Sequence, residues 1–166
     1  MLWAGPAQGS YPARDLQARF IEMDLHVVPA KKGQTLELGD GASLRVLEVG
    51  KRGAVLLLEW GSFQALLPIG LDFETLEGLQ SKNELGEVTV LLLAESGFAP
   101  VNPEEWIDEL NPQLVLLSVA AGDPEGLPSP ETLEVVEGYN LLRTDRNGWV
   151  KLSTDGEQMW VQAERR

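Results

Sequence analysis

The sequence contains no cysteine and a single histidine, His26. The lack of cysteine excludes disulfides, thiolate metal sites and cysteine nucleophiles, although it leaves the cell compartment open. A binuclear zinc-type centre takes several imidazole and carboxylate ligands and keeps one position for an activated water. One histidine does not supply such a centre, so hydroxide generation by that route is not expected from this chain alone.

Positive charge is also scarce. The chain has 13 Lys and Arg residues against 26 Asp and Glu residues, which gives a formal net charge of −13. A surface of that sign repels phosphate backbones and anionic lipid, so nucleic-acid binding through this domain alone is not expected. The paired basic residues are scattered along the chain: Lys31 and Lys32, Lys51 and Arg52, and Arg143 and Arg146.

Long apolar runs are missing as well. No stretch approaches the ~20 apolar residues of a membrane span, and runs such as residues 88–94 have the length of a strand. The first residues, MLWAGPAQGSYPARD, lack the basic start and apolar stretch of a signal peptide. Membrane attachment is therefore expected only through a region upstream of Met1, for example in an inner-membrane protein, and the localisation stays open.

The composition that remains is that of a globular domain. The chain has 166 residues, of which 43% are hydrophobic and 23% charged, and this balance suits one domain with a single core. Residues 1–12 are rich in Gly, Pro and Ala and predict a flexible N-terminal arm. Residues 13–166 predict one domain, since no low-complexity linker or internal repeat divides them.

Hairpins come first along this domain, and strands alternate with helices after them. Gly39-Asp40-Gly41 and Gly61-Ser62 each predict a hairpin turn, and Asn102 and Ser129 each predict a helix cap. The result is an α/β (mixed α+β) fold, a mixed sheet of hairpins and βαβ units covered by helices on one face. The predicted strands are residues 25–28, 34–38, 43–49, 54–60, 63–68, 88–93, 114–119, 140–144, 149–153 and 158–162, and the longest predicted helices are residues 14–23, 73–80 and 130–137.

Four segments resemble one family in order and spacing. They are residues 52–70 (RGAVLLLEWGSFQALLPIG), 88–98 (VTVLLLAESGF), 110–119 (LNPQLVLLSV) and 141–156 (LLRTDRNGWVKLSTDG). Together they resemble the C-terminal half of the metallo-β-lactamase-like domain of ComEC-type competence (DNA internalisation) proteins. The resemblance implies a metallo-β-lactamase-like half-sandwich, and the NPQ…SV and RTDRNG segments are its most specific parts.

The metal-binding positions of that family differ here. The bridging aspartate of its Thr-Gly-Asp motif corresponds to Gly70, and its two adjacent histidines correspond to Glu95 and Ser96. The histidine of its Gly-His-Pro loop corresponds to Leu127, and no His-x-His-x-Asp-His motif precedes residue 34. The resemblance therefore implies a scaffold without the family's metal ligands and favours a pseudoenzyme over an enzyme.

Three acids near those loops are candidate cation ligands. Asp72, Glu95 and Asp123 follow successive predicted strands, and oxygen ligands suit magnesium or calcium. The competing interpretation is that they are solvated loop acids or helix caps in a chain with 26 acids. We expect no catalytic residues, no metal and no cofactor, with a weakly bound divalent cation as the one alternative.

Nucleophilic catalysis and base stacking have little support in the sequence. Ser96 and Ser118 lack a G-x-S-x-G elbow, and His26 in a short predicted strand is the only available imidazole base. The five tryptophans have no basic groove beside them that would favour base stacking.

Three functions remain open. The first is a noncatalytic, degenerate metallo-β-lactamase-like domain, an accessory or scaffolding module of a ComEC-type DNA-uptake protein. The second is a metallohydrolase or nuclease completed by missing upstream residues or another chain. The third is an acidic protein-interaction module, because a half-fold leaves an apolar sheet face uncovered, and such a face favours a protein partner or self-association.

Overall fold

The structure is a computed structural model, and it describes residues 2–4, 11–81 and 85–165. Within these ranges no helix is both long enough and apolar enough to cross a membrane. The strands are β1 (Leu2–Trp3), β2 (Val28–Pro29), β3 (Thr35–Gly39), β4 (Ala42–Val49), β5 (Ala54–Trp60), β6 (Phe63–Ile69), β7 (Val90–Leu92), β8 (Leu114–Leu117), β9 (Leu141–Arg143), β10 (Val150–Thr154) and β11 (Met159–Ala163). The helices are α1 (Tyr11–Glu22), α2 (Phe73–Gln80), α3 (Glu104–Leu110), α4 (Pro130–Val135) and α5 (Thr144–Asn147), with short 3₁₀ turns at Glu95–Gly97 and Ala99–Val101.

A seven-stranded mixed sheet forms the centre of the fold, in the order β3-β4-β5-β6-β7-β8-β9. Strands β3 to β6 pair antiparallel through hairpins, and β6 to β9 pair parallel. Both predicted hairpin turns are confirmed, and Gly39, Asp40, Gly41 and Gly61 have the positive φ angles that tight hairpin turns require. The predicted α/β class with a mixed sheet is confirmed.

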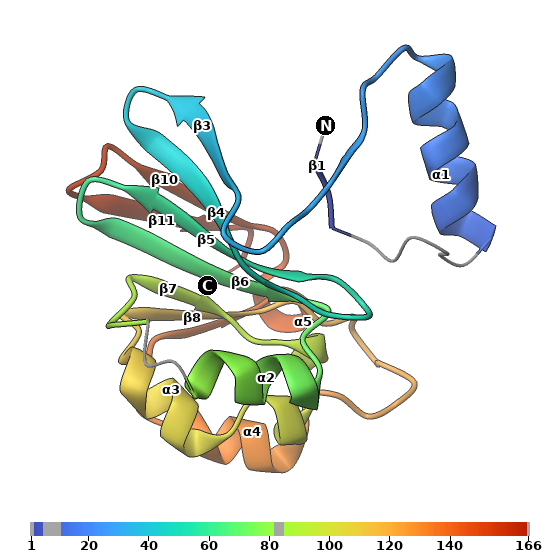
Figure 1. Cartoon of the computed structure of the whole chain (residues 1–166). Helices are drawn as coiled ribbons and strands as arrows, with labels where there is room; N and C mark the ends of the chain where they lie inside the picture. Colours follow the sequence, from blue (N-terminus) through green and yellow to red (C-terminus); the bar gives the residue numbers. More distant parts are fainter. Residues whose placement is uncertain (1, 5–10, 82–84, 166) are drawn as a thin grey trace.

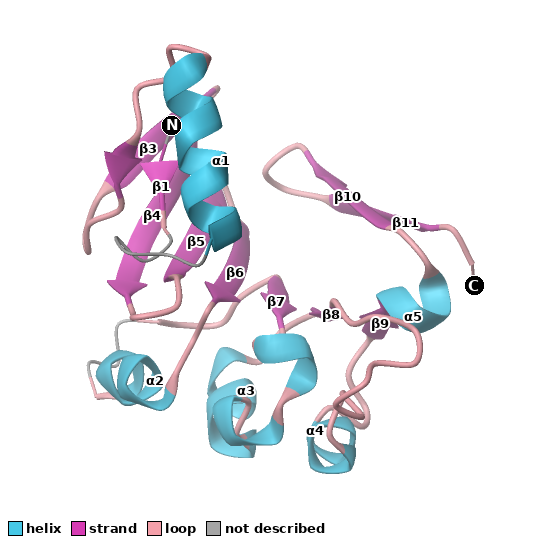
Figure 2. Ribbon diagram, turned by 90° about the vertical axis from the view of Figure 1, so that its right-hand side faces the viewer, coloured by secondary structure: helices cyan, strands magenta, loops and turns pink. Residues whose placement is uncertain are grey.

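Three crossover units build the parallel half of the sheet. Helix α2 connects β6 to β7, α3 connects β7 to β8, and α4 follows β8 and leads to β9. Each unit adds its new strand at the same edge of the sheet, in the order β6, β7, β8 and β9. Because the crossovers all have the same handedness, the three helices lie on the same face (Figure 2). The main core lies between that face and the helices, with Leu57, Leu66, Leu91, Trp106 and Val115 at its centre.

A two-stranded ribbon, β10–β11, crosses the opposite face of the sheet. Its Leu152 and Met159 pack against a second, smaller buried cluster: Phe63, Ala65, Val90 and Leu114. The tip of the ribbon is held at the β5–β6 turn, where the Ser62 N–H donates to the Gly156 carbonyl at 2.7 Å. The prediction of three closing strands is therefore right in number, but only β9 joins the central sheet.

The N-terminal segment differs from its prediction. Helix α1 begins at Tyr11, within the predicted arm, and Leu2–Trp3 pairs parallel with Val28–Pro29. The strand predicted over residues 25–28 begins only at Val28. Residues 1 and 5–10 lie outside the described residues, so the flexibility of the arm stays a prediction. Helix α1 stands away from the sheet and its covering helices (Figure 1).

The predicted role of Asn102 as a helix cap is wrong. Helix α3 is preceded by Pro103, and no side chain caps it. Asn102 is 1% exposed, and its amide instead binds the Ala94 N–H and carbonyl and the Phe98 carbonyl at 2.8–3.0 Å. Ser129 does precede α4, but its hydroxyl accepts from the Ala99 N–H rather than from its own helix. Both side chains hold the loop after β7 because buried backbone groups there need partners.

Replacement of Asn102 by alanine tests this assignment. Asn102→Ala leaves the buried Ala94 N–H without its acceptor and removes one of the hydrogen bonds to each of the Ala94 and Phe98 carbonyls, so we expect the free energy of unfolding to fall by about 1–3 kcal/mol. Urea denaturation measures the loss. The exposed Asn140 makes one bond, to the Gln113 carbonyl, and Asn140→Ala as a control should change stability by less than about 0.5 kcal/mol. Equal effects of the two substitutions would contradict the assignment.

Candidate functional site

The candidate site lies at one edge of the central sheet. Strands β6, β7 and β8 are parallel, so the loops that follow them emerge at the same edge. Gly70 follows β6, Glu95 and Ser96 follow β7, and Leu127 lies in the loop after β8. The four positions that the resemblance assigns to metal ligands therefore belong to loops of three neighbouring strands.

Gly70 lies in a close backbone contact. Its φ angle is +71°, and a Cβ atom added there would be 2.6 Å from the carbonyl carbon of Arg52. A Cβ atom on Gly53 would in turn be 2.3 Å from the Ile69 carbonyl oxygen. The β4–β5 turn thus packs directly on the end of β6, and position 70 has no room for a carboxylate side chain unless that turn moves.

Glu95 and Ser96 have left-handed backbone conformations, with φ angles of 45° and 53°. Such conformations cost non-glycine residues about 1–2 kcal/mol, so the surrounding contacts must hold them. The Glu95 carboxylate forms an ion pair with Arg52 at 2.7 Å, which ties the loop after β7 to the β4–β5 turn. Glu95 therefore has a structural partner in this fold.

The next residue, Gly97, connects the same loop to α4. Its carbonyl accepts hydrogen bonds from the Ser129 N–H at 3.0 Å and the Thr132 hydroxyl at 2.8 Å. A Cβ atom added to Gly97 would be 2.7 Å from the Pro128 Cβ atom. The loop that contains Leu127 is thus packed against the loop after β7, and the half-buried Leu127 contacts the main core.

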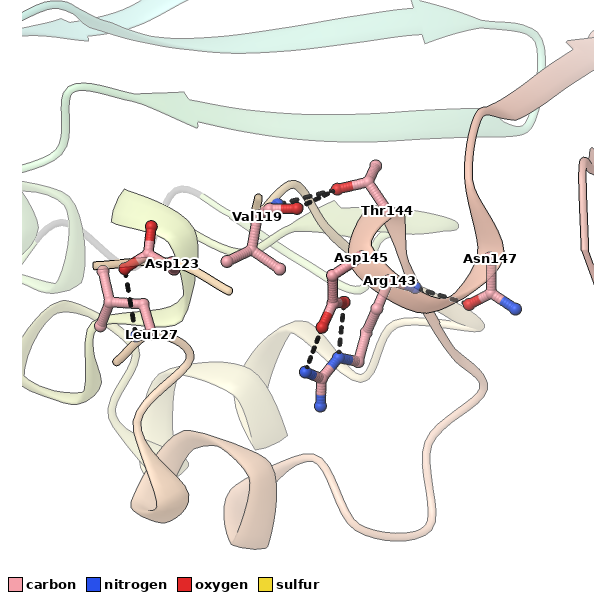
Figure 3. A network of polar contacts seen from close by, with 7 residues as sticks. All are labelled: Val119, Asp123, Leu127, Arg143, Thr144, Asp145 and Asn147. Carbon is pink, nitrogen blue, oxygen red and sulfur yellow. Dashed lines mark hydrogen bonds and ion pairs between the residues drawn. The ribbon is translucent and has the colours of Figure 1, made fainter. Parts of the chain in front are cut away.

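Asp123 organises the loop between β8 and α4. One of its carboxylate oxygens accepts from the backbone N–H groups of Glu125 at 3.0 Å and Leu127 at 3.3 Å (Figure 3). The turn predicted over residues 123–126 is confirmed by the backbone bond from the Gly126 N–H to the Asp123 carbonyl. Asp123 therefore acts as a loop acid of the kind described by the competing interpretation.

Asp72 caps α2. Its Oδ1 atom accepts from the Thr75 N–H at 2.9 Å and the Thr75 hydroxyl at 2.7 Å. These bonds favour the charged carboxylate, and with the Lys51 N–H they lower the pKa of Asp72 below its ordinary value. A Cβ atom on Gly50 would be 2.5 Å from the Thr75 hydroxyl, so the cap also lies tightly against the β4–β5 turn.

The RTDRNG segment forms a polar clamp at the end of β9. Arg143, 8% exposed, makes two hydrogen bonds to the Asp145 carboxylate at 2.7 and 3.0 Å (Figure 3). The hydrogen bond from Arg143 lowers the pKa of Asp145. The Thr144 hydroxyl donates to the Val119 carbonyl and accepts from the Val119 N–H, and the Asn147 amide accepts from the Arg143 N–H. The segment thus fixes β9 against the chain that leaves β8.

Most of the paired basic residues contact acids. Lys51 binds Glu74 at 2.9 Å, and this hydrogen bond raises the pKa of Lys51. Four ion pairs in the described part of the chain involve these residues: Lys32 with Glu48, Lys51 with Glu74, Arg52 with Glu95, and Arg143 with Asp145. These pairs partly offset the charge of the four basic residues.

These residues do not fit a binuclear metal centre. Gly70 and Leu127 offer no side-chain ligand atoms, and Glu95 is paired with Arg52. Over residues 2–4, 11–81 and 85–165, no group of three or more His, Asp or Glu side chains is arranged to hold a metal ion. The structure therefore does not bring Asp72, Glu95 and Asp123 together as one ligand set, and each of them has protein partners.

The candidate nucleophiles lie on separate segments. Ser96 follows β7, and the exposed Ser118 follows β8. His26 lies on the N-terminal segment between α1 and β2, before the strand predicted to contain it actually begins. The two serines and His26 thus come from three different segments of the fold.

A hollow of about 450 Å³ lies beside the Asp72 cap, and the sequence did not indicate it. Acids and one lysine surround it, and its lining is Glu48, Val49, Gly50, Lys51, Asp72, Glu74, Thr75 and Gly78. Two segments that are distant in sequence form this hollow, because the β4–β5 turn packs on the start of α2. Lys32 pairs with Glu48 and Lys51 with Glu74, so the negative charge of two of its acids is offset.

A row of leucines crosses the face of the sheet that lies opposite α2, α3 and α4. Leu56 pairs with Leu67, and Leu116 pairs with both Leu92 and Leu142. The parallel register of Leu66 with Leu91 places Leu67 beside Leu92. All five leucines of this row are half-buried, and two of them, Leu116 and Leu142, pack against the buried cluster beneath the ribbon. We call these five residues the leucine row: Leu56, Leu67, Leu92, Leu116 and Leu142.

Comparison with known proteins gives a partial likeness to a solved structure. No family model matches the chain, and no curated protein matches it. Among solved structures, the chain is similar to a Thermotoga maritima protein assigned to the zinc-dependent hydrolases of the metallo-β-lactamase superfamily, with 18% sequence identity and a TM-score of 0.36. The match covers 55% of this chain and 48% of that protein, so the chain spans about half its length. A likeness of this size identifies neither a family nor an activity.

The Asp72 cap has a testable pH dependence. Asp72→Ala is expected to cost about 1 kcal/mol of unfolding free energy at neutral pH, since the Thr75 N–H loses its acceptor. The lowered pKa of Asp72 means that this contribution is present above the ordinary carboxyl pKa and is lost as the pH falls through the folded-state value.

Urea denaturation of wild type and Asp72→Ala from neutral to acid pH measures this change. The stability gap between the two proteins should narrow as the pH falls. The exposed Glu37 on β3 provides a control, because Glu37→Ala should leave a small and nearly constant gap. A gap for Asp72→Ala that widens towards acid pH would contradict the assignment.

Proposed function

We propose that this chain is a noncatalytic, degenerate metallo-β-lactamase-like domain that acts through protein contacts. Its role is that of an accessory or scaffolding module of a ComEC-type DNA-uptake protein. The proposal rests on two observations at the sheet edge. Position 70 has no room for a metal-binding side chain, and the Glu95 carboxylate is paired with Arg52.

The places of the resembling segments in the fold support the proposal. Residues 52–70 run from the β4–β5 turn through β6, residues 88–98 comprise β7 and its loop, and residues 110–119 contain β8. Residues 141–156 comprise β9, the RTDRNG clamp and β10. The similarity thus follows consecutive elements of one sheet and the loops at one edge.

The contact surfaces of the domain fit such a role better than direct DNA binding. A net charge of −13 opposes a phosphate backbone, whereas exposed apolar side chains such as Ile21, Met23 and Trp149 offer apolar surface to a protein. In the proposed setting, upstream sequence attaches the domain to a membrane channel, and the domain contributes contacts rather than chemistry. These exposed apolar side chains equally favour a second function, an acidic protein-interaction module unrelated to DNA uptake.

Metal titration and a nuclease assay test the noncatalytic role. Isothermal titration with zinc and with manganese should give no saturable binding in the micromolar range, because the family's ligand positions do not provide a donor set. Incubation with single-stranded DNA and either metal should give no cleavage above the protein-free rate.

A matched variant makes this test decisive. Glu95→Ala removes the one carboxylate at the former metal positions, and it should behave like the wild type in both assays. Micromolar metal binding together with cleavage, both lost in Glu95→Ala, would overturn the noncatalytic role and favour the metallohydrolase alternative.

Uptake of labelled DNA separates the two noncatalytic roles. Deletion of this domain in its native host should lower uptake severalfold if it belongs to the DNA-uptake machinery, and Glu95→Ala should leave uptake unchanged. Normal uptake after the deletion would reject the competence role and leave the unrelated interaction module.

A further inference from the structure

A groove lies between the β10–β11 ribbon and the β9 edge of the central sheet. Two adjoining hollows of about 580 and 500 Å³ form it, and Leu142 and Val161 line both of them. Leu142 is the member of the leucine row on β9, and Val161 is 41% exposed on β11. Met159 lines the smaller hollow and Ala163 the larger one, so the groove follows the length of β11.

Strand β11 has a free edge along this groove. Among the described strands it pairs only with β10, and the Glu164 N–H donates to the Trp149 carbonyl at 3.0 Å where the ribbon begins. Because alternate residues of an antiparallel pair exchange hydrogen bonds, this bond fixes which backbone groups of β11 face β10. The N–H and carbonyl groups that point the other way belong to Met159, Val161 and Ala163.

Arg165, the next residue in that alternation, shows where the free edge faces. Its N–H donates to the Asn147 carbonyl at 3.0 Å, and the Asn147 side-chain amide donates to the Arg165 carbonyl at 3.2 Å. The outward edge of β11 is therefore turned towards α5 and β9, and these two bonds close one end of the groove. Within the described part of the chain, the outward groups of residues 159, 161 and 163 have no such partner.

An extended chain is the occupant that this edge selects. A row of free N–H and carbonyl groups pairs with another strand, whereas a helix already satisfies its own backbone groups. Strand β11 has five residues, so a partner segment of about 17 Å covers it at about 3.4 Å per residue. Alternate side chains of that segment point into the hollows, where Leu142 and the 56% exposed Trp149 offer apolar contacts.

Charge distinguishes this groove from the rest of the surface. Residues 140–166 contain five Lys and Arg residues and four Asp and Glu residues, whereas residues 1–139 contain eight and 22. Arg165 lines the larger hollow, and no carboxylate of the described residues forms an ion pair with its guanidinium. An acidic side chain at that end of a bound segment complements Arg165 through a charge-assisted hydrogen bond.

We propose that the free edge of β11 binds an extended segment of a partner protein, which joins the ribbon as a third strand. The segment carries apolar side chains at alternate positions and an acidic side chain beside Arg165. This inference rests on the proposed function, because it takes protein contact as the role of the domain and names the surface and the kind of segment bound. Backbone hydrogen bonds supply affinity, and the hollows and Arg165 supply selectivity.

Selection from a random peptide library tests the kind of ligand. Displayed peptides of about eight residues, long enough to span β11, are selected on the full chain. We expect the enriched sequences to alternate apolar and polar residues and to carry Asp or Glu near one end. A failure to enrich any sequence, or enrichment of apolar residues at the i, i+3 and i+4 spacing of a helix, would overturn the proposal.

A proline at position 161 tests the free edge. Val161→Pro removes one outward N–H and leaves the bonds to β10 in place, and strands tolerate proline at such a position. We expect the selected peptide to bind about tenfold more weakly, measured by fluorescence anisotropy. Ile21→Glu is the control, because Ile21 is 73% exposed on α1, and it should bind like the wild type. Equal affinity of Val161→Pro and wild type contradicts strand addition.

A charge exchange tests Arg165 and needs no change within the ribbon. Arg165→Glu should bind the selected acidic peptide severalfold more weakly than the wild type does. The same peptide with lysine in place of its acid should reverse this order. Equal preference of both proteins for the two peptides would rule out the assigned role of Arg165, and this comparison also decides the matter if Val161→Pro does not fold.

Amide hydrogen exchange locates the bound segment. In the free protein the amides of Met159, Val161 and Ala163 should exchange faster than those of Trp160 and Gln162, which face β10. The selected peptide should slow the first three at least tenfold, and slowing confined to another part of the chain refutes the proposed site. The metal titration tests the noncatalytic role separately, so failure here leaves that role undecided by these experiments.

Discussion

Burial of one face of the central sheet beneath α2, α3 and α4 is the constraint on which the other features depend. Successive parallel strands need crossover connections, and crossovers of one hand place their helices on one side. That arrangement buries Leu57, Leu66, Leu91 and Val115 in the main core and sends the loops after β6, β7 and β8 to one edge. It also leaves the opposite face to be covered by other means, and the β10–β11 ribbon covers only part of it.

The loops at that edge are joined to one another and to the β4–β5 turn by structural contacts. The β4–β5 turn packs on Gly70 and on the Asp72 cap, and Arg52 binds Glu95 across the gap between strands. Gly97 and Asn102 fix the loop after β7 to its neighbours through buried hydrogen bonds. An edge whose polar groups bind one another is well suited to hold its shape, and this agrees with a scaffold role better than with hydrolytic chemistry.

Local signals in the sequence predicted the elements well and their long-range contacts poorly. Gly39-Asp40-Gly41 defines its hairpin because few other residues adopt the positive φ angles of such a turn. Asn102 carries an equally strong local signal for a helix cap, yet its amide binds Ala94 and Phe98, since buried backbone groups there require partners. The short helix α5 and the hollow beside Asp72 depend on packing between distant segments, which the sequence pattern does not express.

The sequence by itself determined the α/β class, the order of hairpins and crossover units, the acidic surface, the absence of thiols and the presence of a single imidazole. These follow from composition and from local periodicity. The tertiary structure decided that Glu95 pairs with Arg52, that Asp72 caps α2, and that α1 stands apart from the sheet. Strand order and register bring such residues together, and those are set by the packing of the whole sheet rather than by neighbours in the chain.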